Sequence, residues 1–263
     1  MPSEASSGTG SLPLLRPDWD VPAPIRAAMS LRGGGCSAAP WDSLNLGERV
    51  GDDPACVARN RRAFAAAIGA TPVWLQQVHG TQVLSLQHAP PPAAPRADAA
   101  WTREPGLACT VQVADCMPVL FAAARAHGVA AAHAGWRGLA AGVLEATLTA
   151  LCEGTGCEAR DVVVWLGPCI GPNRFEVGED VLHAFGQAPL HCDAALFMAR
   201  PRADGQPRWL ANLPALARAR LQRAGVQRIC GGRWCTVEAR SDFFSFRRDG
   251  VTGRHAAAIW IDR

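Results

Sequence analysis

The sequence predicts an α/β fold, a single domain with a central mixed β-sheet flanked by helices. Apolar runs typical of buried strands recur along the chain, and several segments between them have the periodicity of amphipathic helices. The 263 residues are enough for one large domain. Hydrophobic residues make up 49% of the chain and charged residues 19%, which is typical of a globular protein and excludes a disordered one.

We expect residues 1–24 to be disordered or irregular and residues 25–263 to form the domain. The N-terminal residues lack the basic and apolar regions of a secretory signal, and no window approaches the roughly 18 apolar residues of a membrane span. The net charge of +3 is small and the arginines are scattered, which argues against a nucleic-acid partner. The sequence therefore predicts a cytoplasmic protein that binds neither a membrane nor a nucleic acid.

The first regular element after the entry is predicted to be a helix over residues 52–69. Asp52 or Asp53 is suited to cap its N-terminus, and Gly69 is suited to end it. Residues 29–47, rich in glycine, serine and asparagine, come before this helix. Such a segment is either a surface turn or a loop that wraps closely around a ligand, because glycine permits backbone conformations that other residues avoid.

The next elements are predicted to be mostly strands. Residues 72–80, "PVWLQQVHG", have the β-branched and aromatic character of a strand, and the proline-rich residues 88–101 are expected to form a loop. The next predicted element is a strand that breaks near Asp115–Cys116 and resumes (106–124). A strand, turn and helix follow (128–151), and then a buried strand that enters a loop (161–172). The last predicted elements are a short helix (177–186), a helix capped by Asn212 (213–225) and two strands (227–238 and 254–261).

Three metal-capable residues, His79, Cys116 and His133, stand where apolar strands are predicted to end. We refer to them as the trio. Strand ends meet at one edge of a sheet, where α/β proteins usually build their sites, so we expect an open site there rather than a place in the core. Two imidazoles and a thiolate suit Zn²⁺ and leave a fourth position open. Their long separations are unlike specific zinc motifs, so a buried cysteine and two hydrogen-bonded histidines are the alternative.

Other charged residues are candidates for binding an anion or moving a proton. Arg137 stands with glycines at a predicted helix start, a place that favours phosphate, although it also suits a surface arginine. Arg247, Arg248 and Arg254 occur beside phenylalanines, either to hold a base and a phosphate or in a solvent-facing hairpin. Asp115 is a candidate acid or base only if the backbone breaks there, because adjacent side chains of a strand face opposite ways.

Ten cysteines in a chain without a secretory signal predict reduced thiols, metal ligands or buried small residues. Two pairs, Cys152 with Cys157 and Cys230 with Cys235, have a spacing that matches no standard zinc knuckle. We therefore expect no four-thiolate site.

Six motifs in this order resemble one family, the YfiH-like or laccase-domain proteins. They are "SLRGGGCSAAPWDSLNLGERVGDDPACVARNR", "QQVHG", "ADCMPVLF", "AHAGWRGLAAGV", "GPCIGPNRFEVGEDV" and "DFFSFRRDGVTGR". The resemblance covers residues 25–262 and implies a YfiH-like catalytic domain with α/β/β/α layers. It implies that the trio is both metal-binding and catalytic. Residues at matching motif positions are implied to bind substrate and phosphate: Arg32, Asn45, Arg137 and Arg247.

Members of this family are described as polyphenol oxidases, purine nucleoside phosphorylases and peptidoglycan editing factors. A four-copper oxidase needs more histidines than the 7 present, usually in His-x-His pairs that this chain lacks. The resemblance implies instead a zinc-dependent purine nucleoside enzyme, a monomer or small homo-oligomer, with copper the less favoured metal. Its expected reactions are phosphorolysis of adenosine, inosine or methylthioadenosine and deamination of adenosine.

Two alternatives remain open. The first is a hydrolase or amidase in which Cys116 is the nucleophile and His133 the base. The second is a peptidoglycan editing factor that acts on cell-wall precursors.

Overall fold

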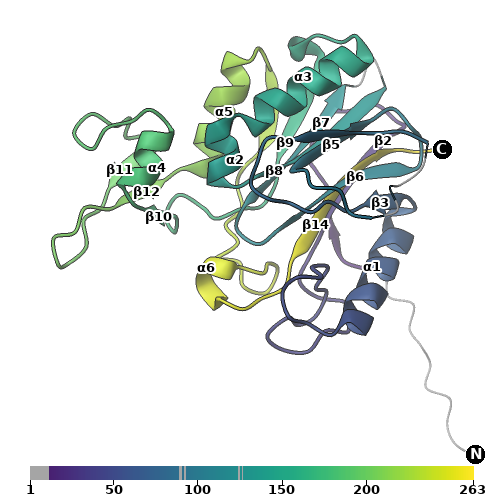
Figure 1. Ribbon diagram of the computed structural model, residues 1–263, viewed down its shortest axis with the longest axis horizontal. Coiled ribbons are helices and arrows are strands. Elements are labelled where there is room, and N and C mark those ends of the chain that lie inside the picture. Colours follow the sequence, from purple (N-terminus) through teal and green to yellow (C-terminus); the bar gives the residue numbers. More distant parts are fainter. Residues whose placement is uncertain (1–11, 89–90, 92, 124, 126) are drawn as a thin grey trace, which may run out of the picture.

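The computed structural model describes residues 12–88, 91, 93–123, 125 and 127–263 (Figure 1). It confirms the α/β fold and shows two large sheets instead of one central sheet. The six-stranded sheet has the order β13-β9-β7-β8-β5-β4 and is mixed, because its two outer pairs are parallel and the others antiparallel. Its strands are β4 (Val83–Leu86), β5 (Ala99–Thr102), β7 (Met117–Ala123), β8 (Gly128–Ala134), β9 (Val163–Leu166) and β13 (Arg228–Gly231).

The five-stranded sheet has the order β1-β2-β14-β6-β3. Its strands are β1 (Leu14–Leu15), β2 (Ile25–Ser30), β3 (Thr71–Val73), β6 (Leu107–Val113) and β14 (His255–Ile261). The two sheets pack face to face, since Val111 and Ile259 of this sheet share one apolar cluster with Leu120, Ala131 and Trp165 of the other. Burying these facing surfaces is the main stabilising contribution at the centre of the molecule.

Helices cover the outer faces of both sheets. Helix α1 (Pro54–Ile68) packs Phe64 against Trp260 of β14, whereas α3 (Val143–Thr155) and α5 (Leu213–Arg223) cover the six-stranded sheet. The layers are therefore α/β/β/α, as the resemblance implied. Two short helices, α2 (Trp136–Ala141) and α6 (Phe246–Asp249), follow β8 and precede β14.

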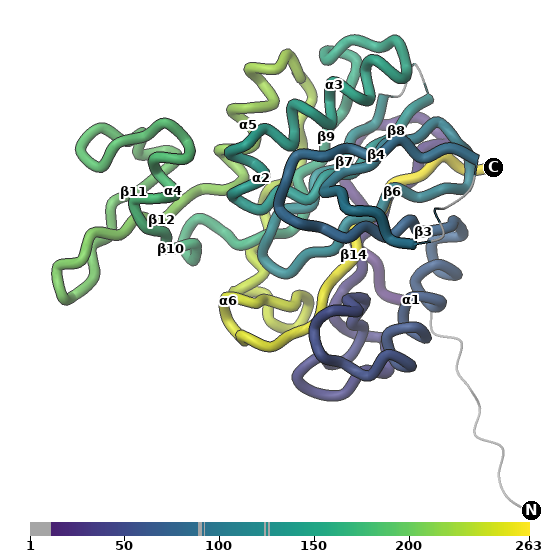
Figure 2. The backbone as a smooth tube through the Cα atoms, in the orientation of Figure 1, coloured from purple at the N-terminus to yellow at the C-terminus, as the bar shows by residue number. Residues whose placement is uncertain are grey.

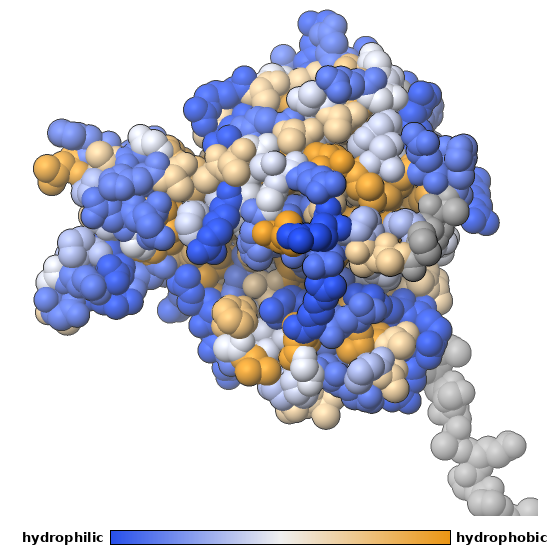
Figure 3. All heavy atoms as spheres, viewed as in Figure 1, coloured by the Kyte–Doolittle hydropathy of each residue, from blue (hydrophilic) through white to orange (hydrophobic). Residues whose placement is uncertain are grey.

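An arm projects from this layered body (Figures 1 and 2). It consists of α4 (Glu179–Ala184) and a three-stranded sheet of β10 (Glu176–Val177), β11 (Phe197–Ala199) and β12 (Trp209–Ala211). Its surface is mainly hydrophilic on the face shown in Figure 3. No helix in the described part of the chain is long and apolar enough to cross a membrane.

The helix boundaries predicted from capping residues are confirmed. The Asp53 carboxylate accepts hydrogen bonds from the backbone of Ala55 and Cys56, and Gly69 ends α1 in the left-handed conformation. Asn212 caps α5 in the same way. Residues 128–151 form two helices after the strand rather than one, because Gly142, with φ of 102°, ends α2 and begins α3.

The strand predicted over residues 72–80 is wrong for most of its length. Only Thr71–Val73 is a strand, and the rest of the segment is irregular apart from a single bridge at Gln76. Residues 1–11, and positions 89, 90 and 92 of the proline-rich loop, lie outside the described residues. Within the irregular entry, Leu14–Leu15 pairs with β2.

Candidate metal centre

The structure brings the trio together at one edge of the six-stranded sheet. His133 lies in β8 opposite Pro118 of β7, Cys116 lies directly before β7, and His79 lies in the irregular segment after β3. One ligand atom from each residue lies within 4.8 Å of the others, and the Cys116 Sγ is 3.7 Å from His79 Nε2. His79 is exposed and Cys116 half-buried, but His133 is only 3% exposed. The site is therefore less open than the sequence predicted.

A buried carboxylate, Asp98, orients both histidines. Its Oδ1 atom is 2.9 Å from His133 Nδ1 and also accepts a hydrogen bond from the backbone N–H of His79. Its Oδ2 atom accepts from the backbone N–H groups of Val78 and Gly80. Because Nδ1 of His133 is engaged by Asp98, its Nε2 is the nitrogen free to bind a metal, an arrangement common among metal-binding histidines.

These same bonds explain why the segment before His79 is not a strand. Three consecutive backbone N–H groups point at one carboxylate, which is incompatible with an extended ladder. His79 has a φ of 61°, a left-handed conformation that is uncommon for a residue other than glycine. Burial opposes the charged form of Asp98, but the bonds from His133, Gly80 and Val78 outweigh it and lower the pKa of the carboxyl.

The metal-free trio holds a separated pair of charges. Desolvation alone would raise the pKa of the Cys116 thiol, but the charge of His133 and the hydrogen bonds with both histidines lower it to about 6. Desolvation would likewise lower the pKa of His133, but the Cys116 charge and the bond with Asp98 raise it to about 9. Between these values the pair exists as a thiolate and an imidazolium, and the thiolate is the form that binds metals.

Gly135 keeps the backbone close to the trio at the start of α2. A Cβ atom there would lie 2.6 Å from His79 Cδ2 and 3.0 Å from Cys116 Sγ. Its φ of −67° is accessible to any residue, so the need for glycine here is one of space and not of backbone conformation. The first glycine of "HAGWRG" is therefore explained by close packing beside a metal-capable site.

The trio lies in the wall of a cavity of about 310 Å³, at the small end of the range for small-molecule sites. Three arginines line this cavity: Arg49, Arg61 and Arg254. Two of them lie over aromatic rings of the same wall, Arg61 at 4.1 Å from the Trp74 ring centre and Arg254 at 5.8 Å from that of Phe246. The cavity thus combines metal ligands, cationic groups and aromatic faces.

Two of the residues that the resemblance implies, Asn45 and Arg247, lie beside residues that line the cavity. Asn45 is fully buried, and its Oδ1 atom accepts hydrogen bonds from the backbone of Gly47 and Arg254, which both line the cavity. The backbone N–H of Arg247 donates to Asp115, while its guanidinium donates to the Glu176 carbonyl. Neither Asn45 nor Arg247 is itself among the lining residues.

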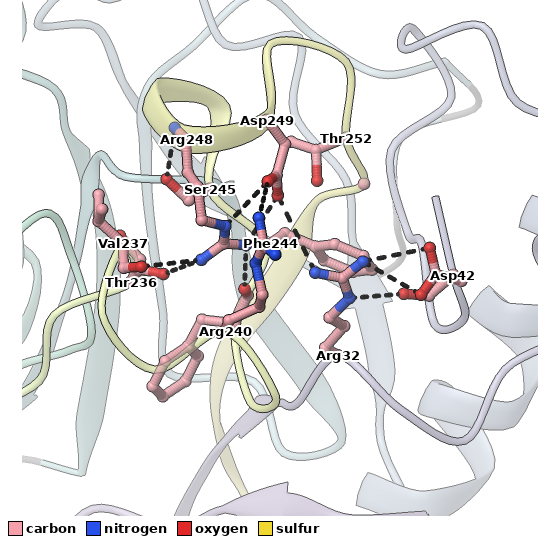
Figure 4. Close-up of polar contacts among 12 residues, drawn as sticks. Arg32, Asp42, Thr236, Val237, Arg240, Phe244, Ser245, Arg248, Asp249 and Thr252 are labelled. Atoms are coloured by element: carbon pink, nitrogen blue, oxygen red, sulfur yellow. Dashed lines mark hydrogen bonds and ion pairs between the residues drawn. The ribbon is translucent and has the colours of Figure 1, made fainter. Parts of the chain in front are cut away.

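The other two implied residues lie elsewhere. Arg32 lines a separate cavity of about 630 Å³ and donates to the backbone and carboxylate of Asp42, with Asp249 at 3.9 Å (Figure 4). The guanidinium of Arg137 lies 4.4 Å from the ring centre of Trp136. The binding roles of all four residues stay predictions.

Asp115 stands where the backbone breaks between β6 and β7, with a φ of 87°. Its carboxylate accepts hydrogen bonds from the Thr236 hydroxyl and from the backbone of Arg247, and so holds α6 beside the cavity. This placement gives Asp115 a positioning role.

Four residues of the site were not predicted from the sequence: Asp98, Arg49, Arg61 and Gly135. The available signal for Asp98 was an acidic residue in a segment made almost entirely of alanine and proline. Asp98 directly precedes β5, which begins within the residues predicted to form a loop. No local signal marked the arginines.

The fold and this site define a layered α/β protein with a metal-capable His–Cys–His trio in a cavity at a sheet edge. Residues 26–262 match the family model described as "Multi-copper polyphenol oxidoreductase laccase". The chain belongs to this family, which includes the YfiH proteins.

Relatives with known names match almost the whole chain. A protein named purine nucleoside phosphorylase from Pseudomonas aeruginosa is 47% identical over 247 residues, 94% of this chain and 98% of the relative. The purine nucleoside phosphorylase YfiH of Escherichia coli is 46% identical with the same coverage. A crystal structure of a Neisseria meningitidis protein matches with a TM-score of 0.85 at 42% identity, over 95% of this chain and 99% of that chain.

Replacing Asp98 tests its control of the trio. We expect Asp98→Asn to lower zinc affinity by about 10- to 100-fold, because the amide cannot hold His133 in place with a full negative charge. Competition with a chromophoric chelator measures this affinity. The matched control is Asp262→Asn, an acid bonded to Arg26 near the C-terminus, and an equal loss in both variants would contradict the assignment.

The pH dependence of Cys116 alkylation in the metal-free protein tests whether Cys116 and His133 form a thiolate–imidazolium pair. We expect iodoacetamide to alkylate Cys116 at a half-maximal rate near pH 6, because the lowered pKa keeps the reactive thiolate populated above that pH and loses it below. Cys109 is fully buried, which raises its pKa, and it should stay unlabelled. Labelling is followed by mass spectrometry, and a midpoint near the ordinary thiol value of about 8.5 would rule the pair out.

Adding one methyl group at position 135 tests whether the trio needs the space that glycine leaves beside it. Gly135→Ala should displace His79 and lower zinc affinity by at least about tenfold. Gly33→Ala is the matched control, since nothing lies within 4 Å of a Cβ atom at that position. Unchanged affinity in Gly135→Ala would show that the close contacts do not constrain the ligands.

Proposed function

We propose that this protein is a metal-dependent purine nucleoside phosphorylase in which the trio holds Zn²⁺. The observation that carries the proposal is the meeting of the trio with three arginines and two aromatic rings in one cavity. The names of the relatives support the same substrate class. Adenosine, inosine and methylthioadenosine are the proposed substrates, with deamination of adenosine as a second activity.

The donor set fits zinc on chemical grounds. Zinc favours sulfur and nitrogen ligands, and here one thiol is already ionised at neutral pH and one imidazole is oriented through its far nitrogen. Donor atoms within 4.8 Å of one another can close around one ion with small side-chain adjustments. When bound, the metal supplies a positive charge that stabilises negative charge developing on an oxygen of the substrates.

The chain's own groups would bind and orient the two substrates. Trp74 and Phe246 bring aromatic rings for a purine, and Arg254 offers a guanidinium group for phosphate, whereas Arg61 is already paired with Glu48. In phosphorolysis a phosphate oxygen forms a bond to ribose C1′ while the bond from C1′ to the purine nitrogen breaks. The purine leaves with the bonding electron pair and takes up a proton from phosphate or water.

Arg254 is the best-placed cation for this phosphate. Its guanidinium is largely withdrawn from solvent, which lowers its pKa, and the nearby Cys116 and Asp115 charges partly oppose that shift. Two backbone carbonyls, of Thr252 and Gly253, accept hydrogen bonds from its Nη1 and fix the direction of the side chain. A fixed, partly desolvated guanidinium stabilises an anion more strongly than a solvated one does.

The copper chemistry in the family description is less well supported by the residues. Among the residues that the structure describes, one group of three side chains can hold a metal, whereas a laccase needs ligands for several copper ions. A soft thiolate-and-imidazole set would still bind copper where that metal is abundant.

A cysteine hydrolase is the second candidate function. The thiolate of Cys116 and the imidazolium of His133 have the protonation states of a catalytic pair. A strong chelator distinguishes the two functions, because it inactivates a zinc enzyme and leaves a metal-free hydrolase active. Alkylation of the metal-free protein followed by assay of amide hydrolysis tests the hydrolase directly.

Product analysis tests the proposed function. Incubation of the purified protein with adenosine and phosphate should yield adenine and ribose 1-phosphate, and incubation without phosphate should yield inosine. We expect Cys116→Ala, His79→Ala and His133→Ala each to abolish turnover, with some loss of stability for the buried His133. Normal turnover by any of them would remove that residue from the proposed site.

A substitution at Arg254 separates the two activities. We expect Arg254→Gln to lower kcat/KM for phosphorolysis by about 100-fold, because the phosphate loses a charge-assisted contact, and to affect deamination much less. Arg233→Gln is the matched control, since that arginine is exposed beside Trp234 and does not line the cavity. Equal losses in both reactions would contradict a phosphate role.

A further inference from the structure

We propose that Cys36 and Cys56 form a peroxide-sensitive pair that closes reversibly into a disulfide. Cys36 is exposed in the glycine-rich loop, and Cys56 lies in the first turn of α1. Each thiol donates a hydrogen bond to the backbone carbonyl of the other residue, at 3.4 Å from Cys36 and 3.1 Å from Cys56. This reciprocal arrangement brings the two side chains face to face.

A positive charge lies beside the Cys56 sulfur. The Nη2 atom of Arg59 lies 3.0 Å from the Cys56 sulfur, and the N-terminus of the 15-residue helix α1 adds a partial positive charge. The pKa of the Cys56 thiol is nevertheless raised, because the hydrogen bond with the Cys36 thiol and burial outweigh the effect of Arg59. The exposed Cys36 is the sulfur that a dissolved oxidant reaches first.

A second pair of close thiols lacks these features and serves as an internal comparison. The sulfurs of Cys152 and Cys157 lie 3.6 Å apart at the end of α3. Burial, the contact with Cys157 and the charge of Asp161 raise the pKa of Cys152 to about 12. The charged group acting on this thiol is thus the carboxylate of Asp161, whereas Cys56 has the guanidinium of Arg59.

The oxidation is balanced with hydrogen peroxide as the oxidant. The thiolate of Cys36 attacks one peroxide oxygen, the O–O bond breaks, and a sulfenic acid and hydroxide form. The thiolate of Cys56 then attacks the Cys36 sulfur, the S–S bond forms and a second hydroxide leaves. With the two thiol protons, the hydroxides become two waters, so two thiols are oxidised as one peroxide is reduced. A small dithiol reverses the reaction by exchange.

The disulfide would restrain one wall of the cavity that contains the trio. The segment between the two cysteines contains residues 47–50, which line that cavity. At present it is tied to α1 by the buried Asn60, whose amide bonds the backbone of Cys36, Ser43 and Asn45. A covalent link adds a bond that cannot open by thermal motion, so oxidation restrains this wall without touching the trio. The proposal does not depend on which reaction the cavity catalyses.

Tryptic cleavage reads out this disulfide unambiguously. Cleavage after Arg32, Arg49 and Arg59 gives peptides 33–49 and 50–59, each with a single cysteine. The full chain, with Zn²⁺ added to protect Cys116, is treated with a small excess of hydrogen peroxide, blocked with N-ethylmaleimide and digested without reductant. We expect the two peptides as one linked species, two hydrogens lighter than their sum, which dithiothreitol separates.

Matched serine variants and hydrogen exchange complete the test. Cys36→Ser should abolish the linked species, and Cys152→Ser should leave it unchanged. Backbone amides of residues 37–50 should exchange more slowly in the oxidised protein than in the reduced one. Peptide 33–49 carrying a sulfinic or sulfonic acid while Cys56 stays a free thiol, or oxidation at Cys152–Cys157 alone, would overturn the pairing. Unchanged exchange in the linked protein would overturn the effect on the cavity wall.

Discussion

The buried carboxylate of Asp98 is the constraint on which the metal centre depends. It lies directly before β5, and its backbone carbonyl accepts a hydrogen bond from the backbone of His133 while its side chain holds the imidazole of the same residue. Through the N–H groups of residues 78–80 it also fixes the loop that carries His79. A fully buried carboxylate without such bonds would strongly destabilise the folded protein. The hydrogen bonds that build the site therefore also stabilise the fold.

The position of the cavity follows from the two packed sheets. The trio belongs to the edge of the six-stranded sheet, whereas residues 112–114 at the end of β6 bring the neighbouring sheet into the same wall. The loop before α1 and the segment after α6 add Arg49 and Arg254. Asn45 joins these two segments to each other through the backbone of Arg254, and Asp115 joins α6 to the body through the backbone of Arg247. A small cavity is thus built from parts of the chain that are far apart in sequence.

Local signals predicted much of the fold, and residue chemistry predicted part of the site. Asp53, Gly69 and Asn212 marked helix ends because capping depends on neighbours within a turn. The irregular path before His79 escaped prediction because its cause, Asp98, is distant in sequence. Arg49 and Arg61 escaped prediction for the same reason: Arg61, for example, reaches the cavity from α1 through packing on Trp74, which no pattern along the chain reveals. Stacking of the two sheets likewise came from the family resemblance and not from periodicity.

One metal ion is expected to bind the three ligands of the trio, which the single carboxylate of Asp98 positions. X-ray absorption at the zinc edge, on protein loaded with one equivalent of Zn²⁺, tests this claim most directly. The account predicts one sulfur ligand at about 2.3 Å and two imidazole nitrogens at about 2.0 Å, with a light atom completing the shell. A shell with two or more sulfurs, or with oxygen ligands alone, would contradict it.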